Sequence, residues 1–185
     1  MNRDLRSQTD VEQNCRERLP CFTGMLVAVA AFFYSLVRRM TQTTRKLQFA
    51  LQMEDDWPPI SSEAVWCDSQ GSTFRLKNAP FFIKGLAVND VFKAEPDPVN
   101  GHVFEFELLE SSNHSLVWIV NNTQADIGPV LSQLRDLGCS TEGLEQFSLY
   151  AVDVPPDVQD KNLNDLLDKA EAAGLDLAFP VWRRM

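Results

Sequence analysis

The chain has 185 residues, of which 44% are hydrophobic, enough to bury the core of one ordinary domain or of two very small ones. Its net charge is −9, and an acidic chain without clustered Lys and Arg binds a phosphate backbone poorly, which disfavours nucleic-acid binding. The four cysteines have no CxxC spacing, so we predict neither a zinc site nor a redox motif, and we expect no cofactor.

The first predicted segment is an N-terminal extension, residues 1–39, which contains an apolar run at 21–37. At about 1.5 Å per residue this run only just crosses a hydrocarbon layer of about 30 Å. Arg38 and Arg39 follow it, and Met40 offers a second start. Two interpretations stay open: translation starts at Met40, which we favour, or the run is the transmembrane helix of a single-pass membrane protein.

Residues 40–112 are predicted to form a small β-rich subdomain, because short apolar runs alternate with turn residues. Strands are expected at 47–51, 64–67, 73–76, 90–94 and 103–108, with a hairpin loop at 68–71. The clearest strand is 103–108, where alternation places Phe104, Phe106 and Leu108 on a core face and two glutamates on a solvated face. The pattern predicts a small, strongly bent β-meander or barrel.

Residues 113–185 are predicted to form an α/β sandwich subdomain. Strands are expected at 116–120, 147–154 and 175–179, and helices at 127–137 and 163–170. Asp126 is the expected N-cap of the first helix, and Gly138 and Gly174 are the expected stops. This β-α-β-α-β order predicts an open sandwich of ferredoxin-like type, so the fold class of the whole chain is α+β.

The predicted seam between the two subdomains carries one set of candidate residues. His114 lies in a polar cluster there and could act as an acid or base, or simply cap the junction. A groove at the seam would place Lys84, Asn113, His114 and Ser115 near a ligand. Ser115 would need a partnered histidine and carboxylate to act as a nucleophile, so we predict no catalytic residue. Asp153, just before a proline pair, is interpreted as a turn or helix cap.

A second set of candidates is acidic. Glu54, Asp55 and Asp56 stand beside Trp57, and this mixture of charge with an aromatic side chain is used to dock basic protein surfaces. A solvated loop would have the same sequence. The remaining thiols of a chain that starts at Met40, Cys67 and Cys139, are expected to be buried and reduced, although a bridge between them stays open.

Several motifs resemble an uncharacterised bacterial family, domain of unknown function number 4265. They are EAVWC at 63–67, FRLKNAPFF at 74–82, LGC at 137–139 and YAVDVPP at 150–156, and the likeness covers residues 46–180. The resemblance implies a shared fold rather than an activity. Where the family has Gly-His-Ser-Thr-x-Arg, His114 and Ser115 match, but Leu116 and Trp118 replace the Thr and Arg. The resemblance therefore implies only lining roles for His114 and Ser115.

The charge and the lack of a recognisable catalytic constellation together favour a non-catalytic bacterial module in the cytoplasm. We expect it to bind a basic protein partner, as an immunity or regulatory protein. One alternative is an enzyme or small-molecule sensor with its site at the seam. The other is a single-pass, membrane-anchored domain, which requires that residues 21–37 be translated and inserted.

Overall fold

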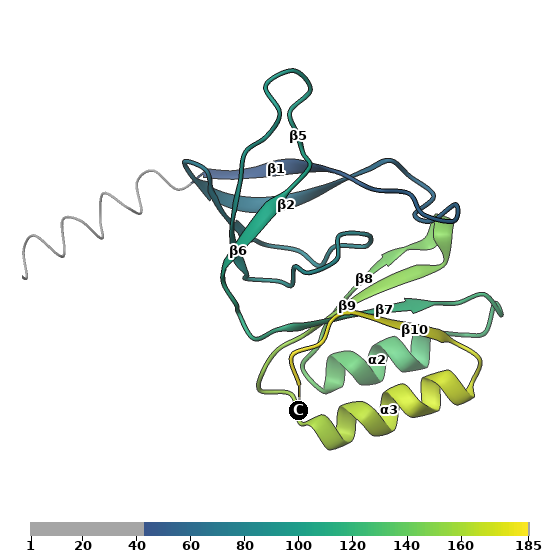
Figure 1. The fold of residues 1–185 in the computed structure, drawn as a ribbon. Helices are drawn as coiled ribbons and strands as arrows, with labels where there is room; N and C mark the ends of the chain where they lie inside the picture. The colour runs from purple at the N-terminus through teal and green to yellow at the C-terminus, as the bar shows by residue number, and fades with distance from the viewer. Residues whose placement is uncertain (1–42, 185) are drawn as a thin grey trace, which may run out of the picture. The chain divides into compact units, whose positions relative to one another are not determined.

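The computed structural model describes residues 43–184 (Figure 1). The predicted N-terminal extension, with its apolar run at 21–37, lies outside the described residues. Within residues 43–184, no helix combines the length and the hydropathy that a membrane span requires. The described residues form one compact unit, and its two sheets hold the candidate site residues.

The first sheet has six strands in the order β5-β1-β2-β3-β4-β6. Neighbouring strands are antiparallel except for β1 and β5, which are parallel. The strands are β1 (Thr43–Ala50), β2 (Ser62–Gln70), β3 (Thr73–Leu76), β4 (Val91–Ala94), β5 (His102–Val103) and β6 (Phe106–Glu110).

The predicted hairpin is confirmed. Gln70 pairs with Thr73, and Gly71 has a φ of +63°, a conformation that glycine adopts without steric cost. β2 alternates buried and exposed residues along its length, as a half-buried strand should, so its inward-facing positions contribute Val65 and Cys67 to the core. Both strands of this hairpin lie where alternation predicted them, and β2 is longer than expected.

The predicted strand at 103–108 is wrong in one respect: it is divided between two edges of the sheet. Val103 pairs with Phe49 of β1, whereas Phe106 pairs with Ala94 of β4. Phe104 is therefore 63% exposed and Leu108 is 41% exposed, although alternation had placed both on a core face. Alternation reports which residues share a face, but it cannot show where the chain changes its pairing partner.

The change of partner also determines the shape of the sheet. β5 and β6 occupy opposite edges of the sheet, yet only two residues separate them in sequence. Because the three Cα–Cα steps from Val103 to Phe106 span at most about 11 Å when extended, the sheet must curve strongly to bring its edges together. Within residues 43–184 the two edges do not pair, so of the two predicted alternatives the strong bend is present and the barrel is not.

The second sheet has four antiparallel strands in the order β10-β7-β9-β8. Helices α2 and α3 both cover one of its faces, on the side away from the first sheet (Figure 1). The elements are β7 (Ser115–Val120), α2 (Gly128–Asp136), β8 (Ser140–Leu144), the 3-10 turn η1 (Glu145–Phe147), β9 (Leu149–Val154), α3 (Asp160–Ala172) and β10 (Asp176–Val181).

Two details of this half differ from the sequence prediction. The N-cap of α2 is Ile127, although Asp126 still contributes, because its Oδ1 accepts the N–H of Gly128 at 3.0 Å. Strand β8 was not predicted, because the polar sequence STEGL has no apolar run and the strand lies at the sheet edge. The described residues thus form a mostly β fold with two helices and two sheets.

Three clusters of buried apolar side chains hold these layers together. One lies between the second sheet and its helices, and another lies inside the bent first sheet. The third joins the two halves: Ala79, Phe82 and Ala87 from the loop between β3 and β4 pack against Leu116 and Trp118 of β7. Burial of this apolar surface makes the two sheets one unit.

Candidate functional site

The acidic candidates lie in the loop between β1 and β2. The loop closes through reciprocal backbone hydrogen bonds between Glu54 and Trp57, at 2.8 and 3.0 Å. Its central residues, Asp55 and Asp56, have φ values of +52° and +63°. Aspartate tolerates the left-handed region better than most residues, so the sequence is suited to a tight turn in which both central residues have positive φ. The turn presents Trp57 at its end.

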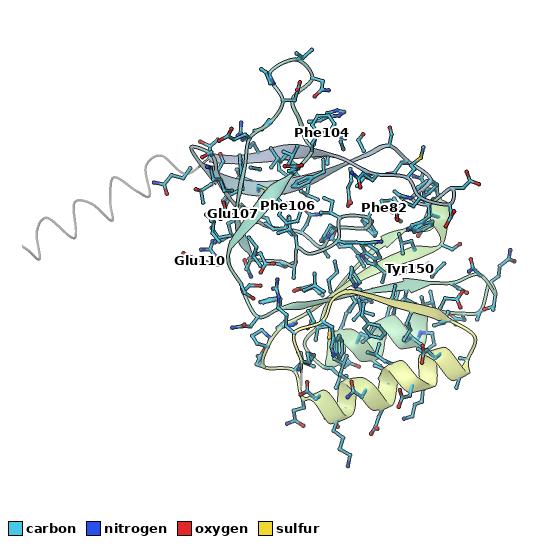
Figure 2. The ribbon with its side chains drawn as sticks, viewed as in Figure 1. Phe82, Phe104, Phe106, Glu107, Glu110 and Tyr150 are labelled. Atoms are coloured by element: carbon cyan, nitrogen blue, oxygen red, sulfur yellow. The ribbon has the colours of Figure 1, made fainter. Side chains whose placement is uncertain are left out.

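Trp57 borders a groove of about 380 Å³, which we call the Trp57 groove. The indole is 39% exposed and packs edge-on against Phe82, with ring centroids 5.5 Å apart. Figure 2 shows Phe82 between the two sheets and Phe104 on the segment that joins β5 to β6. The groove is lined by Phe49, Ala50, Leu51, Gln52, Glu54, Asp55, Trp57, Pro58, Phe82, Ile83, Lys84, Phe104 and Phe106.

The groove combines residues from both predicted sets. Of the acidic set, Glu54, Asp55 and Trp57 line it, but Asp56 does not. Lys84, which the sequence assigned to the seam, lines the same groove, whereas Asn113, His114 and Ser115 are not part of it. The seam set is therefore divided between two places. Phe104 was missed as a candidate, because alternation predicted that it was buried.

At the seam, His114 pairs with Asp153. His114 Nδ1 lies 2.8 Å from Asp153 Oδ1, and both side chains are largely buried. The pair forms because His114 directly precedes β7 while Asp153 lies in β9, which β7 contacts along its whole length. Asn113 sits in the turn before it with a φ of +61°. Burial raises the pKa of Asp153, although the hydrogen bond from His114 opposes the shift.

Ser115 is a structural residue. Its side chain is fully buried, and its hydroxyl oxygen accepts the backbone N–H of Arg183 at 3.0 Å. Arg183 in turn forms a bidentate ion pair with Asp90, at 2.7 and 2.8 Å. Burial alone would raise the pKa of Asp90, but hydrogen bonds from Arg183, Ser112 and the N–H of Ala87 outweigh it and hold the pKa below its usual range.

The seam offers no activated nucleophile among the described residues. Ser115 donates no hydrogen bond to His114, and solvent does not reach it. Cys139 and Cys67 are both buried free thiols, which answers the open question of a bridge between them. Burial raises the pKa of Cys139 to about 11 and that of Cys67 to about 12, so both thiols stay protonated near neutral pH. Among residues 43–184, no group of His, Cys, Asp and Glu has the arrangement of a metal site.

A further buried carboxylate, Glu63, was not singled out from the sequence. It accepts the backbone N–H groups of Phe81 and Phe82 at 2.7 and 2.9 Å and so fixes the loop that carries Phe82 into the Trp57 groove. Its only sequence signal is its position: β2 alternation places it inward. Burial raises its pKa in spite of these hydrogen bonds.

This shift gives the first prediction. A raised pKa means that the folded chain binds the proton of Glu63 more tightly than the unfolded chain, so this carboxyl's contribution to stability grows as pH falls. The change is complete below the ordinary pKa of 4.5. We therefore expect the free energy of unfolding, relative to that of Glu63→Gln, to rise from about pH 7 to pH 4.5. Urea titrations at each pH measure it. Glu107→Gln, at an exposed position, is the control. If the free energy of unfolding followed pH in parallel for the unchanged chain and for both variants, the prediction would be contradicted.

Comparisons with known proteins concern the family and the fold. Residues 63–177 match the family described as "Domain of unknown function (DUF4265)". A solved structure described as "Novel crystal structure of a hypothetical protein from Neisseria gonorrhoeae" is similar to the chain with a TM-score of 0.60 at 19% identity. The similarity covers 74% of this chain and 95% of that one, and at this identity it shows the fold alone. No curated protein matches the chain.

Proposed function

The chain belongs to the DUF4265 family, and because that family is defined by a domain of unknown function, we propose the function from the chain's own surface: it binds a basic protein partner through the Trp57 groove. The observation that carries this proposal is the exposed indole of Trp57, held edge-on against Phe82 beside two carboxylates. The module would be non-catalytic and would act in the bacterial cytoplasm as an immunity or regulatory protein.

The charges of the groove support a basic partner. Among residues 43–184, the groove is lined by two carboxylates, Glu54 and Asp55, and by one cation, Lys84, and neither carboxylate forms an ion pair. The whole chain has a net charge of −9. A partner with the opposite charge would be steered toward the groove, and its Lys or Arg side chains would pair with the free carboxylates.

The aromatic lining supports a protein partner rather than a small solute. Trp57 and Phe104 are exposed large side chains that line one groove, and interfaces are enriched in aromatic residues at their centres. Trp57 is also restrained by its contact with Phe82, so little side-chain entropy is lost on binding. An aromatic side chain that is already ordered is a good candidate for a residue that dominates the binding energy.

We also propose that the second half of the chain is of ferredoxin-like type. The strand order β10-β7-β9-β8, with two helices on one face, supports this assignment. In such a layer the helices shield one face of the sheet. The other face is free to pack on a second body, and here it packs on the loop that carries Phe82.

The second prediction tests the proposal. The partner is first purified from cell extract on the full chain at low and at high salt, and its affinity is then measured by calorimetry. Trp57→Ala is expected to weaken binding about 30-fold, the effect of a residue worth about 2 kcal/mol. Trp66→Ala is the matched control, because Trp66 is 47% exposed on β2 but does not line the groove. Equal affinities of the two variants, or no recoverable partner at either salt, would refute the proposal.

A further inference from the structure

A second groove, of about 380 Å³, lies between α3 and the edge strand β10. We call it the α3–β10 groove. It shares no residue with the Trp57 groove and was not singled out from the sequence. It is lined by Asn164, Leu167, Asp168, Glu171, Leu177, Phe179 and Trp182.

The periodicity of both elements builds this groove. The four helical residues follow the spacing of one helix face, and Leu177 and Phe179 are two positions apart on one face of β10. Leu177 packs against the core under the helices, so it forms the floor. Phe179 and Trp182 form an edge-to-face pair with ring centroids 5.0 Å apart. The groove therefore has an apolar floor and an aromatic wall.

The aromatic wall is not covered by any other described part of the chain. Phe179 is 45% exposed and Trp182 is 39% exposed. Large apolar side chains gathered at a groove on the surface are typical of a protein interaction site. The volume lies at the low end of the range for ligand pockets, about 300–1,000 Å³, which suits one or two large side chains of a partner.

The charges at the groove are of one sign. Among residues 43–184, Asp168 and Glu171 are the only charged residues that line it, and neither forms an ion pair there. The two nearby arginines do not neutralise them, because Arg183 pairs with Asp90 and Arg184 pairs with Asp160. The rim thus offers two free carboxylates beside an aromatic wall. A second copy of the chain, with the same acidic rim and a net charge of −9, would be repelled.

The strand edge favours one shape of partner. Among residues 43–184, β10 pairs with β7 alone, and its pairing register shifts between Ala178 and Val181. Pro180 lies inside that shift, and a proline has no backbone N–H to donate to an added strand. A partner strand would therefore meet an interrupted edge, whereas a helix can use side chains alone.

We propose that the α3–β10 groove docks a basic amphipathic helix of a protein partner. One or two large apolar side chains of that helix enter the groove against Phe179 and Trp182. Lys or Arg side chains, one turn away on the same helix, pair with Asp168 and Glu171. This docking is independent of the Trp57 groove, so one molecule can hold both contacts at once.

The third prediction tests this docking with a defined probe. The probe is a fluorescein-labelled helical peptide of about 18 residues, long enough to hold a helix, with Leu on one face and Lys on the other. A peptide in which Glu replaces every Lys is its control. Anisotropy titrations use the full chain at two salt concentrations. We expect saturable binding of the Lys peptide, at least about 10-fold weaker binding of the Glu peptide, and loss of affinity at high salt.

Variants of the chain test whether the Lys peptide binds at the α3–β10 groove. Phe179→Ala and Trp182→Ala are each expected to weaken binding of the Lys peptide about 10-fold. The double variant D168N/E171Q, at two exposed positions, is expected to weaken it severalfold and to flatten its salt dependence. Trp66→Ala removes an exposed indole that lines neither groove and should leave the affinity unchanged, whereas a loss in Trp57→Ala without a loss in Phe179→Ala would place the peptide in the Trp57 groove and count against this inference. If either aromatic variant loses the circular dichroism spectrum of the folded chain, the affinity of D168N/E171Q for the Lys peptide decides whether the groove binds it.

Three results would overturn the inference. The first is equal affinity for the Lys and Glu peptides, which would remove the charge argument. The second is an affinity for the Lys peptide that D168N/E171Q leaves unchanged, or that Trp57→Ala lowers while the groove variants do not. The third is a concentration-dependent dimer in sedimentation that Phe179→Ala dissociates, since a second copy would then occupy the groove.

Discussion

Arg183→Met is expected to lower the free energy of unfolding by about 3–5 kcal/mol, the usual cost of removing one partner of a buried ion pair. Asp90 has no exposed surface, and the guanidinium of Arg183 supplies two of its hydrogen bonds, at 2.7 and 2.8 Å. Without Arg183 the Asp90 carboxylate stays buried with only the donors of Ala87 and Ser112. Urea denaturation at neutral pH measures the loss.

Two further variants make this test specific. Arg135→Met is the matched control, since Arg135 is exposed and bonds only to Thr141 among the described side chains, and its loss should cost at most about 1 kcal/mol. The double variant D90N/R183M should lose less than Arg183→Met plus Asp90→Asn, because it leaves no buried charge. Equal losses in Arg183→Met and Arg135→Met would show that the buried pair adds no stability.

Trp118→Ala is expected to lower the free energy of unfolding by a similar amount, about 3–5 kcal/mol. Trp118 is 4% exposed in the apolar cluster that joins the two sheets, and its Nε1–H donates to the carbonyl oxygen of Pro80 at 2.7 Å. The variant removes both the ring and the hydrogen bond at the contact between the halves. Thermal and urea denaturation of the full chain measure the effect.

The ring and the hydrogen bond of Trp118 can be separated. Trp118→Phe keeps most of the apolar volume but leaves the Pro80 carbonyl without its donor, so it should cost about 1–3 kcal/mol. Trp66→Ala removes an exposed indole and should change stability by less than about 1 kcal/mol. If Trp118→Ala cost no more than Trp66→Ala, the apolar cluster between the sheets would not hold the halves together.

The sequence predicts elements well where one face is buried and a turn marks each end. β2, β3, α2 and α3 lie close to their predicted positions, because alternation, helical spacing and the stops Gly138 and Gly174 act locally. Local signals fail at the sheet edges. β8 has a polar sequence with no local strand signal, and it forms by pairing with β9. The segment 103–108 looks like one strand, because alternation carries no information about which strand it pairs with.

The candidate sites were harder to predict, because their residues meet through tertiary pairing. His114 and Asp153 are 39 residues apart, and Asp90 and Arg183 are 93 residues apart. Their contacts depend on the register of β7 against β9 and on the path of the last residues described. The acidic loop with Trp57 was predicted because its residues are consecutive. Its partners in the groove, Lys84 and Phe104, come from other elements and could not be placed.

The Asp90–Arg183 pair has a consequence for synthesis on the ribosome. Asp90 precedes Arg183 by 93 residues, so during synthesis the carboxylate has no counter-ion until those residues have been added. The strands of the first sheet all lie within residues 43–110 and can pair before the second half exists. Until then the contact between the two halves is incomplete, and the apolar surface that it will bury stays exposed to water and to other chains.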